Sequence, residues 1–186
     1  APTPEKARDL LAAAGAVLFD LDGTLCRLFA HVPLAVHLAE LRREVARLGV
    51  DLGDFHDPYR AMVAAERDPS LTEPQRHDVV GLLHARLVTL ELASVGQAAP
   101  VPGAVELVDS LLARGVPVGV VTTNSTLCAE AFLAAHGLGG RGVVVQGRSN
   151  LRPTVLKPDP TPVRLALLDL GTEPGDAVLV GDSPRR

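Results

Sequence analysis

The stretch Ala16-Val-Leu-Phe-Asp-Leu-Asp-Gly-Thr24 decides the fold of this 186-residue chain. Its first four residues are apolar without alternation, which is typical of a strand covered on both faces in a parallel sheet. Two aspartates then frame a leucine, and the glycine after them allows a sharp turn. In a doubly wound sheet, ligands bind at the carboxyl ends of the strands. The stretch therefore predicts a buried first strand that delivers Asp20 and Asp22 into a ligand-binding cleft.

Three more apolar runs predict the other strands of this sheet. They lie at residues 116–122, 143–145 and 177–181, and segments with helical patterns lie at 3–14, 104–114, 127–136 and 162–170. Strands that alternate with helices of about ten residues indicate βαβ units. The predicted fold class is therefore α/β, with a doubly wound parallel sheet.

A long segment after the first strand interrupts this alternation. Its apolar positions recur with helical spacing and show no convincing strand pattern. Helices are expected at residues 34–48, 58–67 and 73–95. Two prolines and a glycine predict that residues 97–103 form a linker without regular structure. The predicted organisation is an α/β core of residues 1–25 and 100–186, with a helical insert of residues 26–99 that packs as its own small bundle.

The composition argues against several classes of protein. The net charge is −4, and the aromatic residues are four Phe and one Tyr, whereas nucleic-acid binders usually combine a basic field with aromatic stacking faces. No apolar run reaches the ~20 residues that cross a bilayer, so no membrane association is expected. Cys26 and Cys128 lie far apart without metal-binding spacing, which favours a reducing compartment and a cytoplasmic location. The sequence leaves the oligomeric state open.

Polar residues also follow the later predicted strands. Thr122 and Thr123 end the second core strand, and their hydroxyls can donate to phosphoryl oxygens. Lys157 precedes a proline. It and Lys6 are the only two lysines among the 18 basic residues of the chain. Asp182 follows the last strand and can complete an oxygen-rich site for Mg²⁺. Each signal alone has a plainer interpretation, namely a helix cap, a solvated charge or a turn.

The order and spacing of these residues resemble the motifs of the haloacid dehalogenase-like (HAD) superfamily. Asp20-Leu-Asp-Gly-Thr24 looks like the first motif, Thr122 the second, Lys157 the third and Gly181-Asp182 the fourth. A shift by one residue would move the second motif to Thr123. The resemblance implies the phosphatase branch, similar to phosphoglycolate phosphatase-like members, with the helical insert as a type 1 cap. It also implies that the C-terminal end of the core is missing, together with a second acid of the fourth motif.

The resemblance implies a Mg²⁺-dependent phosphatase that acts on a small phosphorylated metabolite. Asp20 would be the nucleophile that forms an aspartyl phosphate, and Asp22 the general acid and base. Thr122, Thr123 and Lys157 would hold the phosphate, while Asp20, Asp22 and Asp182 would hold Mg²⁺. An acid at position 22 distinguishes phosphoryl chemistry from the carbon–halogen cleavage found elsewhere in the family. Two alternatives stay open: a phosphosugar mutase on the same core, and a non-catalytic binding module with this fold.

Overall fold

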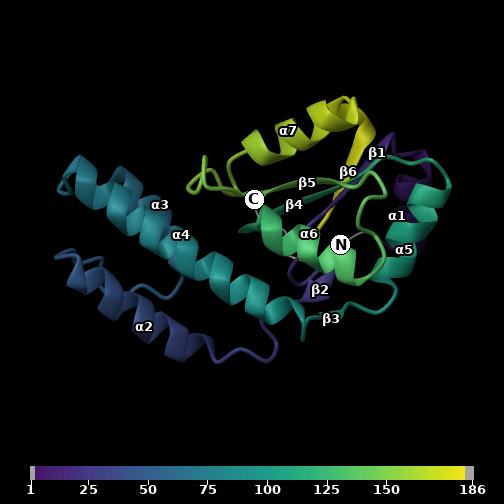
Figure 1. Ribbon diagram of the computed structural model, residues 1–186. Helices are drawn as coiled ribbons and strands as arrows, with labels where there is room; N and C mark the ends of the chain where they lie inside the picture. The colour runs from purple at the N-terminus through teal and green to yellow at the C-terminus, as the bar shows by residue number, and fades with distance from the viewer. Residues whose placement is uncertain (1–2, 183–186) are drawn as a thin grey trace.

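The computed structural model describes residues 3–182 and confirms the α/β fold with a parallel sheet. The sheet contains β1 (Ala16–Phe19), β4 (Val118–Ser125), β5 (Val144–Arg148) and β6 (Ala177–Val180). The strand order is β5-β4-β1-β6, and every neighbouring pair is parallel (Figure 1). β1 lies in the interior of this sheet and is buried at all four positions. The carboxyl end of β1 therefore opens at the centre of the sheet edge where a ligand is expected.

Helices cover both faces of the sheet, as the burial of β1 at every position requires. The helices of the core are α1 (Pro4–Ala13), α5 (Ala104–Ala113), α6 (Thr126–Ala135) and α7 (Thr161–Leu170), and a short 3-10 turn spans Pro174–Asp176. Val17 and Phe19 pack in a cluster that includes residues of α5 and α6. Leu18, between them, packs instead against α7. Figure 1 shows α6 and α7 on opposite sides of the strands, so successive side chains of β1 enter two different apolar layers.

Three helices form the segment between β1 and β4. They are α2 (Leu34–Arg47), α3 (Pro58–Arg67) and α4 (Glu73–Val95), and Figure 1 shows them extending to one side of the sheet. Their facing side chains form a buried cluster separate from those of the sheet, in which Met62, Val79 and Leu83 are among the most buried. The long helix α4 also packs on α6 and β4. The segment thus has its own apolar centre and a second contact with the core along α4.

The expectation of an irregular linker at residues 97–103 is wrong in one place. Ala99–Pro100 forms β3, which pairs with β2 (Cys26–Arg27) in a two-stranded antiparallel sheet. The backbone N–H of Val101 donates to the carbonyl of Leu25 at 3.0 Å. Because Val101 supplies this N–H donor, β3 can pair with β2 although Pro100 has no backbone N–H. The two connections between the helical segment and the sheet are consequently tied to each other.

Two further observations concern the limits of the described chain. β6 forms one edge of the described sheet. The expected second acid of the fourth motif and the end of the core would lie after Asp182, outside the described residues. Within residues 3–182, no helix has the length and apolar character needed to cross a membrane.

Candidate functional site

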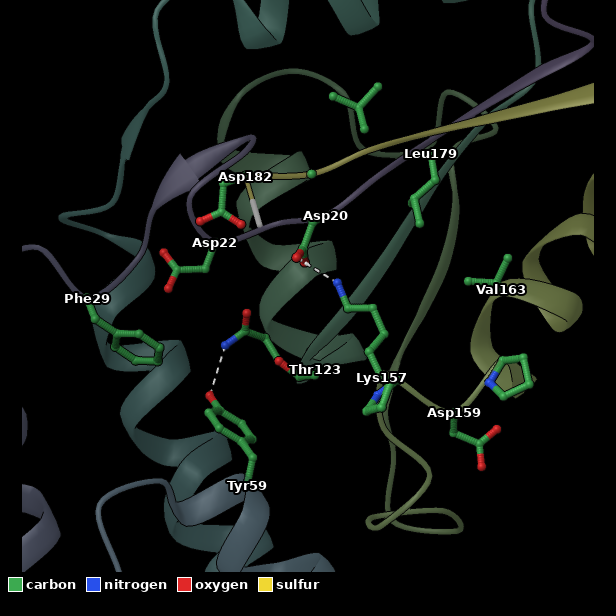
Figure 2. Close-up of a pocket in the computed structure, with 15 residues that line it drawn as sticks. Asp20, Asp22, Phe29, Tyr59, Thr123, Lys157, Asp159, Val163, Leu179 and Asp182 are labelled. Carbon is green, nitrogen blue, oxygen red and sulfur yellow. Dashed lines mark hydrogen bonds and ion pairs between the residues drawn. The ribbon is translucent and has the colours of Figure 1, made fainter. Parts of the chain in front are cut away.

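A cavity of about 430 Å³ lies where the strands of the parallel sheet end. Five of the six site residues predicted from the sequence line it: Asp20, Asp22, Thr123, Lys157 and Asp182. Asp20 follows β1, Thr123 belongs to β4, and Asp182 follows β6. Figure 2 shows their side chains around one hollow. The parallel topology therefore gathers residues that lie more than a hundred positions apart in the sequence.

Asp20 and Lys157 form an ion pair on the wall of this cavity. The Lys157 Nζ lies 2.6 Å from Oδ2 of Asp20, and the two side chains are only 20% and 24% exposed (Figure 2). The other carboxylate oxygen of Asp20 accepts a hydrogen bond from the N–H of Leu21 at 2.8 Å. A charge-assisted contact in a partly buried site is stronger and more directional than one at the surface. It holds the Asp20 carboxylate in a single orientation at the end of β1.

Asp22 has a different environment from Asp20. Burial raises the pKa of the Asp22 carboxyl, and the negative charges of Asp20 and Asp182 raise it further. A hydrogen bond from the N–H of Leu28 to Oδ1, at 2.8 Å, opposes this shift in the pKa. Because the net direction is upward, Asp22 takes up a proton more readily than an ordinary aspartate. Two carboxylates with different proton affinities are suited to separate roles, one ionised and one exchanging protons.

Gly23 allows the turn that brings Asp182 against this loop. Its φ is +82°, and a Cβ added there would lie 2.5 Å from Oδ2 of Asp182. A side chain at position 23 would therefore need both a strained backbone and a displaced carboxylate. Position 23 therefore requires a glycine, because Asp182, which follows β6, lies so close to it.

The donor set on this side of the cavity fits Mg²⁺ by its chemistry. Asp20, Asp22 and Asp182 offer hard carboxylate oxygens, and their mutual repulsion is the kind that a divalent cation relieves. Within the described part of the chain, no three acidic, His or Cys side chains form a ready-made metal cage. Mg²⁺ does not require one, because it is usually held by one or two carboxylates together with water and a substrate phosphate.

The structure separates the two threonines at the end of the second core strand. Thr122 is 2% exposed, and its hydroxyl donates to Oδ1 of Asn124 at 3.0 Å. Thr123 lines the cavity. Neighbouring residues of a strand point in opposite directions, so only one of the two can face a ligand. The structure therefore does not bring Thr122 to the cavity and favours the alternative, Thr123.

Sequence reasoning missed a polar group that the helical segment contributes to the same cavity. Tyr59 of α3 and Asn124 of β4 both line it, and Nδ2 of Asn124 donates to the Tyr59 hydroxyl at 3.0 Å (Figure 2). Behind them, Glu91 of α4 and Arg148 of β5 form a fully buried ion pair at 2.7 Å. The one available signal was that Tyr59 is the only tyrosine of the chain. Helical periodicity alone could not place it beside a residue that lies 65 positions later.

Known proteins resemble the chain over most of its length. A family model for haloacid dehalogenase-like hydrolases matches residues 14–185. A phosphoglycolate phosphatase of Rhodospirillum rubrum is 34% identical over 180 residues, covering 91% of this chain and 72% of that protein. An N-acetylmuramic acid 6-phosphate phosphatase of Pseudomonas aeruginosa is 31% identical over 179 residues, covering 91% and 74%.

The structural comparison agrees with the comparison of sequences. A crystal structure of a CbbY mutant from Rhodobacter sphaeroides, in complex with xylulose-(1,5)-bisphosphate, superimposes with a TM-score of 0.60 at 26% identity. The match covers 91% of this chain and 78% of that one. The family match, the two similar phosphatases and the shared fold together establish that this chain belongs to the haloacid dehalogenase-like hydrolase family.

Proposed function

We propose that the chain is a Mg²⁺-dependent phosphatase that hydrolyses a small phosphate monoester through an aspartyl phosphate on Asp20. The observation that carries this proposal is the pairing of the Asp20 carboxylate with the Lys157 ammonium at 2.6 Å inside the cavity. Asp22, with its raised pKa, lies on the same wall. Family membership and the names of the two similar phosphatases support the same reaction class.

The proposed reaction divides one difficult hydrolysis into two displacements. A carboxylate oxygen of Asp20 forms a bond to phosphorus while the bond to the leaving oxygen breaks, and Asp22 donates its proton to that oxygen. Asp22 then accepts a proton from a water molecule that attacks the phosphorus. This second step releases inorganic phosphate and restores the Asp20 carboxylate. The Lys157 ammonium and the Thr123 hydroxyl hold the phosphoryl oxygens on which negative charge develops.

The metal would be held by Asp20, Asp182 and the backbone carbonyl of Asp22. When bound, Mg²⁺ supplies positive charge that offsets the repulsion between a carboxylate nucleophile and a phosphate. The carboxylates on the cavity wall support this assignment, because the charges of Asp20 and Asp182 both raise the pKa of Asp22. A cation beside Asp20 and Asp182 would lower the pKa of Asp22 and stabilise the two ionised carboxylates.

We also propose that residues 26–99 act as a cap over the cavity. Tyr59 and Phe29 come from this segment and line the cavity together with core residues, which supports the assignment. The paired strands β2 and β3 would be the hinge through which the segment joins the core. Closure would exclude bulk water from the phosphoryl site. A reducing, cytoplasmic location is supported by the two buried free thiols, Cys26 and Cys128.

The test of the activity is release of inorganic phosphate from p-nitrophenyl phosphate and from a panel of metabolite phosphate esters. The expected result is turnover that requires Mg²⁺, stops with EDTA and returns when excess Mg²⁺ is added. Phosphorus NMR on sugar phosphates would separate hydrolysis from transfer within the sugar, which is the reaction of a mutase. Absence of phosphate release from every ester in the presence of Mg²⁺ would contradict the proposal.

A further inference from the structure

We propose that the cavity wall formed by Tyr59 and Asn124 accepts hydrogen bonds from the substrate and offers none to it. The preferred substrate would then be the phosphate ester of a neutral, hydroxyl-rich alcohol or sugar, and an ester whose leaving group carries a carboxylate would be disfavoured. The inference rests on the proposed phosphatase function, because it specifies the leaving group of that reaction. We call these two side chains the acceptor wall.

The hydrogen-bonding capacity of the acceptor wall follows from its existing partners. The Tyr59 hydroxyl donates its only proton to Oε1 of Glu91 at 2.9 Å and accepts from Nδ2 of Asn124 at 3.0 Å. The Asn124 amide also lies 3.3 Å from Oε1 of Glu91. The Asn124 amide nitrogen thus already has two acceptors, and the proton of the phenol is already used. Oδ1 of Asn124 already accepts from the Thr122 hydroxyl at 3.0 Å, so the remaining capacity is one lone pair on that oxygen and one on the Tyr59 oxygen.

This polarity is held in place by a buried carboxylate that can only accept. Glu91 is 0% exposed, and its oxygens accept from Nη2 of Arg148 at 2.7 Å and from the N–H of Ser125 at 2.9 Å. Rotating the Asn124 amide by half a turn would aim Oδ1 at Oε1 of Glu91, oxygen against oxygen. Turning the Tyr59 proton toward the cavity would break its bond to a buried charge. Glu91 therefore selects one orientation of the amide and one of the hydroxyl.

The charge of the cavity favours the same class of leaving group. Its described lining contains four carboxylates, those of Asp20, Asp22, Asp159 and Asp182, against the single ammonium of Lys157. That ammonium is already within 2.6 Å of Asp20, where the phosphoryl group of the substrate is expected. The proposed Mg²⁺ would offset Asp20 and Asp182, but a second negative charge on the substrate would still meet the carboxylate of Asp159 and the acceptor wall.

The main opposing feature is a pair of arginines in the adjoining cavity of about 700 Å³. Arg60 and Arg67 of α3 line that second cavity, and Tyr59 and Lys157 line both. Arg60 already lies 3.4 Å from Asp57, and both arginine side chains are exposed. A guanidinium that is exposed to solvent discriminates weakly between a neutral and an anionic group. We therefore assign the preference for a neutral leaving group to the acceptor wall, whose side chains are fixed by Glu91.

The experiment compares two esters that differ only in the group under test. These are 2-hydroxyethyl phosphate and 2-phosphoglycolate, in which a carboxylate replaces the hydroxymethyl group. The expected ratio of kcat/KM is about 10-fold or more in favour of the hydroxyethyl ester, the size of one good hydrogen bond and one avoided repulsion. Tyr59→Phe should reduce that ratio several-fold, mainly by raising KM for the hydroxyethyl ester.

Thr89→Ala is the matched control, because it removes an exposed hydroxyl of α4 that donates to the carbonyl of Ala85 and is not part of the cavity lining. It should leave the ratio unchanged. Equal or better use of 2-phosphoglycolate by the unmodified protein would overturn the inference and point to Arg60 and Arg67 instead. An unchanged ratio in folded Tyr59→Phe would also overturn it. Hydrolysis of p-nitrophenyl phosphate in the same samples keeps these outcomes apart from a failure of the phosphatase function, which would abolish turnover of all three esters.

Discussion

At the scale of single residues, the shape of the cation beside Asp20 matters as much as its charge. Lys157 places a compact ammonium 2.6 Å from Oδ2 of Asp20, whereas a guanidinium is a wider planar fork that would displace either the carboxylate or a bound phosphate. Lys157→Arg should lower kcat by about 100-fold with little change in Tm, by analogy with loss of one charge-stabilising donor. Lys6→Arg, in the exposed first helix, is the control and should leave both kcat and Tm unchanged. Equal activity of the two variants would show that the shape of the cation at position 157 does not matter for the reaction.

The carboxylate of Asp20 has a sharper test. Asp20→Asn keeps the size of the side chain and its hydrogen bond with the N–H of Leu21, but the amide is a poor nucleophile. Steady-state phosphate release should fall by about 1000-fold or more, the scale seen when a nucleophile is removed. Circular dichroism should confirm an intact fold. Asp51→Asn, an exposed acid of the helical segment, provides the control for charge removal, and near-normal turnover by Asp20→Asn would exclude Asp20 as the nucleophile.

The two cysteines should be chemically inert in the folded protein. Burial raises the pKa of the Cys26 thiol to about 12, with added repulsion from Asp22 and Asp20, and burial likewise raises the pKa of Cys128. Since only the thiolate attacks, both groups stay protonated and unreactive at pH 8. Titration with Ellman's reagent at pH 8 should detect neither thiol in native protein and both in guanidinium chloride. Rapid labelling of a native thiol would contradict the burial of these two side chains.

At the scale of elements, the long helix α4 begins with a reciprocal cap. The Thr72 hydroxyl accepts from the N–H of Gln75, and Oε1 of Gln75 accepts from the N–H of Thr72 at 3.0 Å. Thr72→Ala removes the hydroxyl that accepts from the N–H of Gln75 and should lower the free energy of unfolding by ~1 kcal/mol. Urea denaturation provides the measurement, and Thr72→Ser should restore most of the loss. If alanine and serine have the same effect, the cap does not stabilise α4.

Local patterns predicted most elements because each element has a periodicity that its own residues carry. The apolar run at Ala16–Phe19 became β1, and the helical spacing at 34–48 became α2 with only its last residue shifted. The short strands β2 and β3 carry no such pattern, because two residues contain no period and their pairing joins positions about seventy residues apart. The residue at which β4 ends could not be predicted from such a pattern either. The strand continues to Ser125, with an irregular register after Val121, and counting residues could not decide which threonine faces the cavity.

At the scale of the whole molecule, the sequence predicted residues that line the cavity but not the buried ion pair behind them. Asp20, Asp22 and Asp182 could be proposed because parallel topology brings strand ends together, and Lys157 because its Lys-Pro sequence resembles the third motif of the family. The pairing of Glu91 with Arg148 could not, since it joins a helix of the insert to a strand of the core across 57 positions. Arg148 ends β5 in the structure but lies beyond the strand predicted at residues 143–145, and neither residue belongs to a recognisable motif. Such a pair is visible only once the helices have been placed against the sheet.

That buried pair is expected to dominate the attachment of α4 to the sheet. The side chains of Glu91 and Arg148 are both 0% exposed, and Arg148 also contacts Nδ1 of His84 at 2.5 Å. Burial and the charge of Arg148 lower the pKa of His84, so its neutral imidazole can accept that bond at pH 7. Removing Arg148 would leave a carboxylate buried without its charge partner. Arg148→Met should therefore lower the free energy of unfolding by about 3–5 kcal/mol.

A double-mutant cycle separates this charge effect from the loss of packing. Glu91→Leu together with Arg148→Met leaves no unpaired charge, so its cost should be smaller than the sum of the single changes by about 2 kcal/mol. The control is the exposed pair of Arg86 with Glu44, which joins α4 to α2 at 2.6 Å. Arg86→Met should cost at most about 1 kcal/mol, because solvent screens that pair. Urea unfolding at pH 7 measures all four variants. Strict additivity in the cycle, or equal costs for Arg148→Met and Arg86→Met, would mean that the buried pair does not hold the helical segment to the sheet.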